Sequence, residues 1–502
     1  MKRMSFALFL VIFLSCLKSQ NCCAETYYVD CSSSNVGTGS KRKPWNSLAS
    51  VNSFTFKPGD VILFKRGTKA LGELWPKGSG NENAQITIDA YGEGANPIID
   101  AQGAENSAGI RLSNQEYWTI QNMEVINKSP TLGTRWGIYV VSNDSLVKHR
   151  IHIKNNIVHN VYASYIRARG GKIITFYDVG GIYVKVFEPG RMDDVLIEGN
   201  KLLDIVGIGI CFWGESEMEG RGMNWNNLST KVIVRGNTVI RTGADGILVL
   251  GTDDELIEYN RVDGAGALGT HGDVPGKLNQ GGTDAVAGIW PTRHRNGIVQ
   301  YNEVSDSRRY VGDGQAFDND GFVAGTTIFQ YNYSHDNEGG FFMDCCHPET
   351  TNTGTIVRYN ISQNDGKVSY LDLQKGNVQI YNNVFYTTDT ITVNFSKNNF
   401  FYNNIFWAKY AKWNGNTFEN NSYYGGINTP DDPYKIIGDP MLINPGSGTS
   451  GFKSLDGYKL LNGSPLIFKG KPISKNAKTD FWGNPAAGSS APNIGAYNGK
   501  GR

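Results

Sequence analysis

Two short stretches of the chain place aspartate directly after apolar residues, where a buried strand would be expected to continue with Val, Ile or Leu. They are "AFDND", residues 316–320, and "FFMDCC", residues 341–346. A third stretch, "SYLD", ends in the same way at Asp372. Carboxyl groups act as general acids, general bases or nucleophiles, so several of them at strand ends are candidates for catalysis. Whether they can cooperate depends on whether the fold brings Asp318 and Asp344 together.

An asparagine recurs in a short phrase along much of the chain, as in "GNTVIR", "YNRVDG", "YNEVSD" and "YNNVFY". The recurring asparagines are Asn156, Asn200, Asn237, Asn260, Asn302, Asn332, Asn360, Asn383 and Asn404. The shortest intervals are 23 residues (237 to 260 and 360 to 383) and 21 residues (383 to 404). A period in the low twenties, with alternating apolar residues and no helical stripe, predicts a β-solenoid. The Leu/Asn spacing of a leucine-rich repeat, the alternative solenoid, is absent.

Stacking of coils explains why the repeat is polar. One coil cannot bury its apolar face alone, but coils stacked at about 4.8 Å bury a continuous core and pair their backbone groups. Identical asparagine side chains at one turn can hydrogen-bond along the axis as a ladder. We therefore interpret the asparagines as structural.

The repeat also predicts which side chains face outward. After each asparagine come a polar turn and a short apolar strand, and three such strands end at Asp318, Asp344 and Asp372. The residues just before the strand ends are apolar and are expected to point inward: Phe212, Val249, Phe317, Met343 and Leu371. Because strand side chains alternate, the three aspartates are predicted to stack on the outer face of consecutive coils. Asp320 would lie beside Asp318, with His294 one coil earlier.

Three stacked carboxylates repel one another unless a cation or a proton lies among them, which favours a functional role over a purely structural one. The candidate catalytic residues are therefore Asp318, Asp344, Asp320 and His294. Inserted loops follow Trp213 and Asp344, and loops on one face of a solenoid normally form its binding site. The candidate substrate-binding residues near that face are Trp213, Trp290, Arg293, Asp372 and Lys375.

The chain resembles the right-handed parallel β-helix, or pectate-lyase-like, superfamily of secreted carbohydrate-active proteins. The resemblance rests on "GTGSKRKPWNSLASVN" and "FKPGDVILFKRGT" near the N-terminus and on "GDPMLINP", "DFWGNP" and "NIGAYNG" near the C-terminus. It implies an all-β, single-stranded parallel β-helix with an N-terminal cap and a C-terminal closing segment. The expected parts are a signal peptide (1–24), the cap and first coils (25–105), the β-helix core with inserted loops (106–428) and the closing segment (429–502).

Paired aspartates fit glycoside hydrolysis, which needs two carboxyl groups about 5–5.5 Å apart for retention or ~6.5–9.5 Å apart for inversion. We predict a glycosidase that cleaves a polysaccharide and needs neither a cofactor nor a metal. A polysaccharide lyase is the alternative: calcium held by acidic residues would neutralise a uronate, and Arg293, His294 or Lys375 would be the base. A non-catalytic glycan-binding or adhesin β-helix would explain the fold but not a localised group of acids.

Composition and the start of the chain indicate the setting. Lys and Arg number 48 and Asp and Glu 47, and the net charge of +1 predicts neither a nucleic-acid partner nor an acidic membrane. A basic tip, an apolar run from Phe6 to Leu14 and a small-residue site ending at Ala24 are typical of a secretory signal peptide. We expect a secreted, extracellular monomer that acts on a polysaccharide. The pairing of Cys31, Cys211, Cys345 and Cys346 in an oxidising compartment stays open.

Overall fold

A computed structural model describes most of the chain. The described residues are 24–131, 133–163, 178–215, 217–218, 222–268, 286–309, 313–345, 354–366, 370–374, 376–395, 398–413, 416–486 and 490–502. The predicted signal peptide, apart from Ala24, lies outside the described residues, and so does Lys375.

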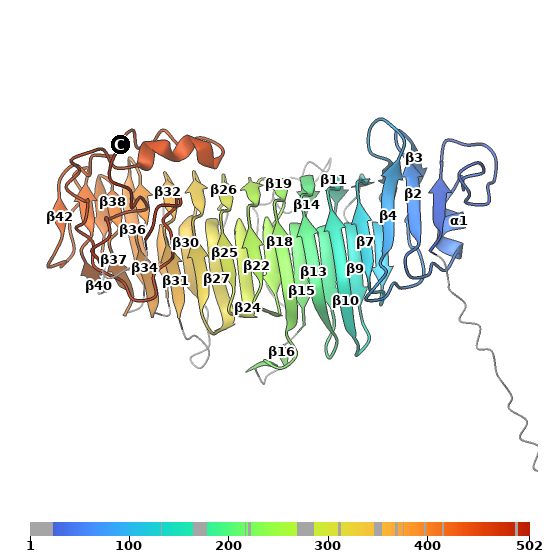
Figure 1. Cartoon of the computed structure of the whole chain (residues 1–502), viewed down its shortest axis with the longest axis horizontal. Helices are drawn as coiled ribbons and strands as arrows, with labels where there is room; N and C mark the ends of the chain where they lie inside the picture. The colour runs from blue at the N-terminus through green and yellow to red at the C-terminus, as the bar shows by residue number, and fades with distance from the viewer. Residues whose placement is uncertain are drawn as a thin grey trace, which may run out of the picture.

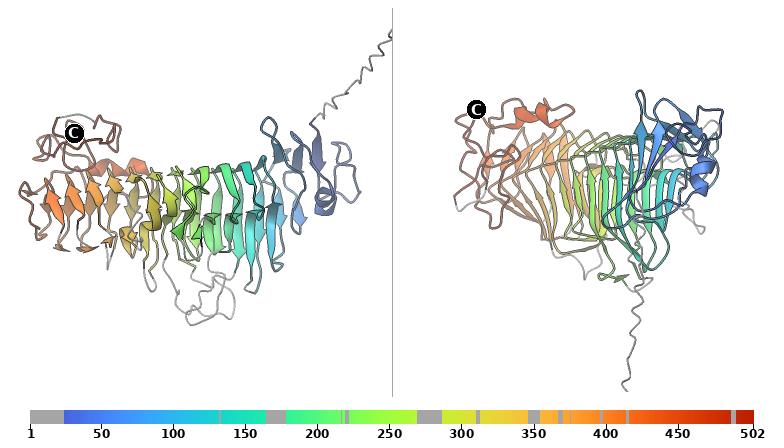
Figure 2. Two further views of the ribbon diagram at one scale, coloured as in Figure 1. Left: turned by 90° about the horizontal axis from the view of Figure 1, so that it is seen from below. Right: turned by 45° about the vertical axis from the view of Figure 1, so that its right-hand side comes forward.

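The described strands form three parallel ladders. A typical coil of the solenoid contributes one strand to each ladder. We refer to them as ladders 1, 2 and 3. Ladders 1 and 2 belong to one 26-stranded sheet, and ladder 3 is a 14-stranded sheet. Figures 1 and 2 show the strands stacked along the long axis, with the N-terminal strands at one end and the last strands at the other. The predicted all-β parallel β-helix is confirmed.

The strands of ladder 1 are β6 (Ser107–Ser113), β9 (Arg135–Ser142), β12 (Gly180–Val186), β15 (Ile208–Gly214), β20 (Ile247–Leu250), β24 (Ile289–Arg295), β27 (Gln315–Ala324), β30 (Gly340–Cys345), β33 (Leu371–Leu373), β36 (Thr390–Phe395) and β39 (Tyr410–Lys412). Those of ladder 2 are β1 (Thr26–Val29), β2 (Val61–Lys65), β4 (Ile86–Tyr91), β7 (Trp118–Gln121), β10 (Val147–Lys154), β13 (Arg191–Glu198), β18 (Ser229–Arg235), β22 (Leu256–Glu258), β25 (Ile298–Gln300), β28 (Thr327–Gln330), β31 (Thr355–Arg358), β34 (Val378–Tyr381), β37 (Phe400–Tyr402) and β40 (Thr417–Glu419).

The strands of ladder 3 are β3 (Lys69–Leu71), β5 (Ile98–Asp100), β8 (Glu124–Asn127), β11 (Ile157–Tyr162), β14 (Lys201–Val206), β19 (Thr238–Thr242), β23 (Arg261–Asp263), β26 (Glu303–Ser305), β29 (Tyr333–His335), β32 (Ile361–Gln363), β35 (Val384–Tyr386), β38 (Ile405–Trp407), β41 (Ser422–Tyr424) and β42 (Ile436–Ile437). The remaining short elements are α1 (Leu48–Ser53), β16 (Glu217–Met218), β17 (Gly222–Met223), β21 (Thr252–Asp253) and the 3₁₀ helix η1 (Phe452–Tyr458).

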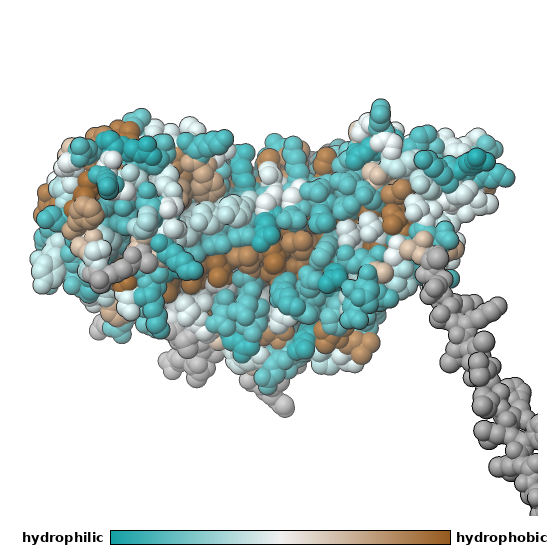
Figure 3. Space-filling model, viewed as in Figure 1, coloured by the Kyte–Doolittle hydropathy of each residue, from teal (hydrophilic) through white to brown (hydrophobic). Residues whose placement is uncertain are grey.

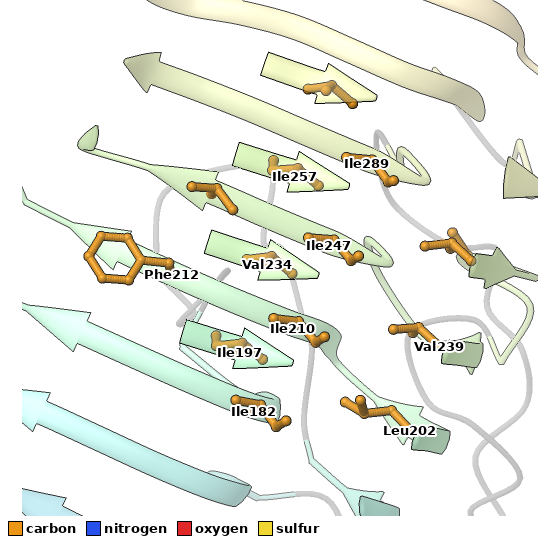
Figure 4. Packing of buried hydrophobic residues seen from close by; sticks show 14 of the residues in the cluster. Ile182, Ile197, Leu202, Ile210, Phe212, Val234, Val239, Ile247, Ile257 and Ile289 are labelled. Atoms are coloured by element: carbon orange, nitrogen blue, oxygen red, sulfur yellow. The ribbon is translucent and has the colours of Figure 1, made fainter. Parts of the chain in front are cut away.

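Apolar side chains fill the inside of the solenoid. Ile210, Ile247 and Ile289 pair in successive strands of ladder 1, and each is fully buried (Figure 4). The corner next to them is tight, because a Cβ on Gly246 would lie 2.3 Å from Val262 Cγ1 of ladder 3. This close approach explains a glycine at that position, and close packing of the corner helps to hold the strand register.

A second apolar cluster lies on the outer side of ladder 1. Strand alternation in β20 sends Ile247 and Val249 into the core and Leu248 and Leu250 outward. The buried members of the outer cluster include Trp136, Tyr139, Tyr183, Ile208, Cys211, Leu248 and Leu250. On the face seen in Figure 3, a band of hydrophobic residues runs along the long axis between hydrophilic rows.

The recurring asparagines form the predicted ladder, in the turn between ladders 2 and 3. From Asn156 onward, Nδ2 of each asparagine donates to Oδ1 of the asparagine in the next coil, at 2.9–3.1 Å. The ladder extends one coil beyond the predicted set, to Asn421, whose Nδ2 donates to Asp432 Oδ2 at 3.0 Å. All of these asparagines are buried, so their structural interpretation is confirmed.

The C-terminal residues pack along the side of the last coils. One hydrophobic cluster joins Tyr331 and Ile361 of the β-helix to Leu455 and Ile494 of the closing segment. Tyr331 also donates its hydroxyl to the backbone oxygen of Thr479 at 2.8 Å. Figures 1 and 2 both place this segment beside the C-terminal coils.

The predicted domain boundaries stay predictions. Within the described residues, every helix is too short or too polar to cross a membrane.

Candidate active site

The register between β27, β30 and β33 decides which aspartates share a face. Asp318 pairs with Met343, and Met343 pairs with Asp372. Asp344 instead pairs with Asn319 and Leu373, one position further along each strand. A shift of one residue moves a side chain to the opposite face of the sheet. The prediction that Asp344 stacks outward with Asp318 and Asp372 is therefore wrong for Asp344.

Asp344 lies inside the solenoid, in a polar network rather than in contact with solvent. Its side chain is fully buried, and its Oδ2 accepts hydrogen bonds from Asn319 Nδ2 at 3.0 Å and Thr355 Oγ1 at 2.8 Å. These partners explain how a carboxyl group is tolerated in the core, since a buried polar group is costly only where its hydrogen bonds are unmet. In this position Asp344 does not contact a substrate on the outer face.

His294 belongs to the same interior network, so its predicted outward position is also wrong. It is fully buried, its Nε2 lies 3.0 Å from Asn319 Oδ1, and its Nδ1 contacts the buried carboxyl of Glu255. The cause is an irregularity between Thr292 and His294 in the pairing of β24 with β27, where Arg293 has a φ of 50°. A bulge of this kind reverses the alternation that the sequence pattern assumes.

The outer face of β27 carries Asp318 and Asp320, as predicted. Trp290 of the preceding coil donates its Nε1–H to Asp320 Oδ1 at 2.6 Å. Side-chain atoms of Asp318, Asp320 and Cys345 all lie within 4.8 Å of one another. Asp318 is 4% exposed and Asp320 is partly exposed. The fold thus brings two carboxyl groups and one indole together at one point of the surface of ladder 1.

Two further aspartates interact electrostatically with this cluster, and sequence reasoning missed both. Burial, and then repulsion from Asp320 and Asp372, raises the pKa of Asp313 to about 6. Burial, and then repulsion from Asp313 and Asp320, raises the pKa of Asp245 to about 7. Both residues stand next to a glycine just before a strand, in "GADG" and "VGDG", where aspartate is usually a turn residue. The sequence signal that could have identified Asp313 and Asp245 as members of the site is that each precedes a strand of ladder 1 in a coil close to β27.

The candidate substrate-binding residues are distributed along the same ladder. Trp213 is half-buried on the outer side of β15, with Lys185 Nζ 5.8 Å from its ring centroid. Lys185 Nζ also donates a hydrogen bond to Asp178 Oδ1 at 2.7 Å. Trp290 and Asp372 are half-buried beside the carboxyl cluster, whereas Arg293 lies in the bulge of β24. Lys375 lies outside the described residues. The binding roles stay predictions.

A metal ion at Asp318, Asp320 and Cys345 would find two carboxylates and one thiol within 4.8 Å of one another. Calcium prefers six to eight oxygen ligands, so the thiol fits calcium poorly. The two carboxylates and the thiol thus give no support to the calcium-dependent lyase alternative.

Among the described residues, no disulfide joins Cys31, Cys211 and Cys345 to one another.

Chemically, the cluster can combine a protonated and an ionised carboxyl group near neutral pH. Asp313, with its raised pKa, retains a proton at a pH where an ordinary aspartate has lost it. The indole N–H of Trp290 donates to Asp320 Oδ1, and a hydrogen bond of this kind stabilises negative charge on a carboxylate. A proton donor and an anionic partner in one cluster are the components of acid–base and nucleophilic chemistry at an acetal.

Comparison with known proteins finds similarity to lacto-N-biosidases. No family model matches the chain. The chain is 26% identical to lacto-N-biosidase from Bifidobacterium longum subsp. longum, over 94% of this chain and 36% of that longer protein. The fold of this chain is similar to that in the crystal structure of GH136 lacto-N-biosidase from Eubacterium ramulus, with a TM-score of 0.58. The two chains are 23% identical, and the match covers 83% of this chain and 67% of that one. The native crystal form of the same protein gives a TM-score of 0.56 at 22% identity.

Proposed function

We propose that this protein is a glycoside hydrolase whose catalytic carboxyl groups lie on the outer face of ladder 1. The observation that carries the proposal is the close pair of Asp318 and Asp320, in which Asp320 is held by the indole N–H of Trp290. Asp313, whose pKa is raised, interacts electrostatically with Asp320. Similarity to a lacto-N-biosidase over 94% of the chain supports the same class of reaction.

Asp313 is the general acid in this proposal. Its pKa of about 6 keeps a fraction of the carboxyl protonated at neutral pH, as protonation of a leaving-group oxygen requires. Repulsion from Asp320 contributes to the raised pKa, so the acid depends on the charge of its partner. This division of roles between two carboxyl groups is the general pattern of glycoside hydrolysis.

Asp320 supplies the ionised carboxylate, either as a nucleophile or as a base that activates water. Trp290 orients it through the 2.6 Å hydrogen bond from Nε1. Asp318, within 4.8 Å of Asp320, adds negative charge beside the reacting carbon. Such charge stabilises an oxocarbenium-like transition state, which carries developing positive charge. The pair of the sequence prediction, Asp318 and Asp344, is thereby replaced by Asp313 and Asp320.

The substrate is a glycan that binds along the outer face, with the half-buried rings of Trp290 and Trp213 contacting sugar rings. The reaction needs no cofactor, because two carboxyl groups suffice for the chemistry. We also propose that the protein is secreted, on the pattern at the start of the chain, and that it acts as a monomer.

The test is hydrolysis by the purified chain without residues 1–24. The substrates are 4-nitrophenyl lacto-N-bioside and a panel of neutral and uronate-containing polysaccharides, and both new reducing ends and unsaturated uronate products are measured. We expect reducing ends alone. NMR of the first-formed anomer then assigns Asp320: retention makes it the nucleophile, and inversion makes it the base.

Two results would contradict the proposal. Calcium-dependent formation of unsaturated products would identify a lyase. The absence of turnover on every substrate, together with retained glycan binding, would identify a non-catalytic β-helix.

A further inference from the structure

A pocket of about 390 Å³ opens at the N-terminal end of the solenoid, far along the chain from the carboxyl cluster. Its volume lies in the range of small-ligand sites. The residues that line it are Asn52, Trp75, Pro76, Lys77, Gly78, Ser113 and Gln115. This lining combines one large aromatic ring with neutral amide and hydroxyl groups and one ammonium, and it includes no carboxyl group.

Trp75 presents an exposed ring on a rigid support. It is 47% exposed, and its backbone N–H donates to Asn52 Oδ1 at 2.7 Å. The guanidinium of Arg111 lies 5.2 Å from the centroid of its ring, and Arg111 Nε is held by Glu73 Oε1 at 2.6 Å. Because its supports are fixed, the ring can act as a platform at little cost in conformational entropy.

The polar wall of the pocket is also rigid. Gln115 Nε2 donates to the backbone oxygen of Gly78 at 2.7 Å, and Gln115 Oε1 accepts the backbone N–H of Ser113 at 3.1 Å. Lys77 adds a positive charge. An aromatic platform flanked by fixed neutral dipoles suits a pyranose ring, which has an apolar face and polar edges. The ammonium favours a neutral or acidic sugar over a basic one.

The strand register places this pocket on the same outer face as the carboxyl cluster. Leu74 bridges Ile110, which makes Trp75 the neighbour of Arg111 on the outer side of ladder 1. The outward column then continues coil by coil from Arg111 through Tyr139, Tyr183, Cys211, Leu248 and Trp290 to Asp318. Trp75 lies one step before Arg111, so seven steps separate Trp75 from Asp318, which at the strand spacing corresponds to roughly 34 Å. Both sites therefore lie on one side of ladder 1. The column between them is buried at Tyr183, Cys211 and Leu248, so a glycan that reaches both sites would lie over the residues that cover this column.

We propose that the pocket around Trp75 is a distal subsite that binds a sugar ring of a long glycan while the same chain is cleaved at the carboxyl cluster. The proposal rests on the proposed glycosidase function and extends it: the substrate is a polymer, or a glycan on a large carrier, and not a free short oligosaccharide. The position of both sites on one side of ladder 1, and a lining without carboxyl groups, favour a glycan over a second copy of this chain as the occupant.

The test compares long and short substrates in variants of Trp75. The long substrate is the polysaccharide that the wild-type protein hydrolyses best, and the short one is its smallest hydrolysed fragment. In Trp75→Ala we expect the ratio of kcat/KM for the long substrate to that for the short one to fall about ten-fold, the loss typical for truncation of an aromatic anchor. Trp75→Tyr keeps a ring and should restore most of the ratio. Tyr434→Ala, which removes a 62% exposed ring from the closing segment, is the matched control.

Binding is measured separately, in the inactive Asp320→Asn protein, by retardation in gels that contain galactan, arabinogalactan or polygalacturonate. Retardation that Trp75→Ala abolishes supports the subsite even if no substrate is turned over, so failure of the glycosidase proposal and failure of the subsite are distinguishable. An unchanged ratio and unchanged retardation in Trp75→Ala would overturn the subsite. Light scattering that detects a dimer dissolved by Trp75→Ala would also overturn it, because the pocket would then be an interface.

Discussion

The two faces of β27 treat polar groups in opposite ways. Asn319 points into the solenoid and makes three hydrogen bonds with buried partners at 3.0–3.1 Å. Its neighbours Asp318 and Asp320 point outward into a cluster where burial and like charge raise the pKa of Asp313 to about 6. The inner polar groups hydrogen-bond one another, whereas the outer carboxyl groups repel one another. A buried acid is therefore not by itself a sign of catalysis; several like charges held close together are a better one.

The largest difference between the faces should be in activity. Asp320→Asn and Asp313→Asn should each lower kcat/KM by about 10²–10⁴-fold, the contribution of general acid–base groups. The melting temperature should not fall, because each replacement removes a repelling charge and the new side chain at position 320 keeps an oxygen that can accept the Trp290 N–H. The measurement is steady-state hydrolysis with thermal melting of the same samples, and Asp389→Asn, on an exposed turn, is the control. Full activity in both variants would remove the pair from the mechanism.

Substitutions on the inner face should lower the stability of the protein. Asp344→Leu leaves Asn319 Nδ2 and Thr355 Oγ1 without their common acceptor, so we expect a loss of about 2–5 kcal/mol in the free energy of unfolding. Asp344→Asn keeps one acceptor oxygen and should lose less. Urea unfolding measures both. If Asp344→Leu were as stable as wild type yet inactive, the interior assignment of Asp344 would have to be abandoned.

The raised pKa values predict that stability falls with rising pH. Burial and like charge raise the pKa of Asp245 to about 7 and that of Asp313 to about 6, above their ordinary value of 3.8. Between about pH 4 and pH 7 the unfolded chain has lost protons that the folded chain retains, so the free energy of unfolding decreases as pH rises. Asp245→Asn replaces this carboxyl group with an amide that stays neutral at every pH. The variant should therefore be more stable than wild type at pH 8 by about 2–4 kcal/mol.

The two proteins should be equally stable near pH 4, where Asp245 is protonated in the folded state. Chemical denaturation at pH 4 and pH 8 provides the comparison. A stability difference that does not grow with pH would show that Asp245 does not carry a raised pKa.

The smallest effect concerns the support of the outer face. Trp290→Phe keeps an aromatic ring but removes the Nε1–H bond to Asp320, so kcat/KM should fall about ten-fold, the equivalent of one hydrogen bond to a charged group. The KM should change less than kcat, because the ring that contacts the sugar is retained. A larger effect on KM than on kcat would assign Trp290 to binding rather than to orientation of Asp320.

The sequence predicts the fold well because the repeated asparagine has one physical role in every coil. From Asn156 to Asn404, each predicted position lies in the ladder, and the strand bounds follow from it. The outward direction of Asp318, Asp320 and Asp372 was also predictable, because the strands around them alternate regularly.

The interior positions of Asp344 and His294 were not predictable from alternation. Phe341, Phe342 and Met343 are all apolar, so this stretch does not reveal which residues point inward, and a one-residue error moves Asp344 to the wrong face. His294 follows a bulge that no residue pattern announces. Asp313 and Asp245 were missed because aspartate beside glycine is normally read as part of a turn.

The asparagine ladder has a direction, and Asp432 gives it an end. Every Nδ2 donates toward the C-terminal end of the solenoid, so the side-chain amide dipoles align with their positive ends toward Asn421. The Oδ2 of Asp432 accepts both the Nδ2 and the backbone N–H of Asn421 at 3.0 Å. An anion thus terminates a row of aligned amides, as an acidic residue caps the N-terminus of an α-helix. The last coil therefore offers no free side-chain donor to a further asparagine at this position, so the capped ladder resists growth by end-to-end addition of another copy.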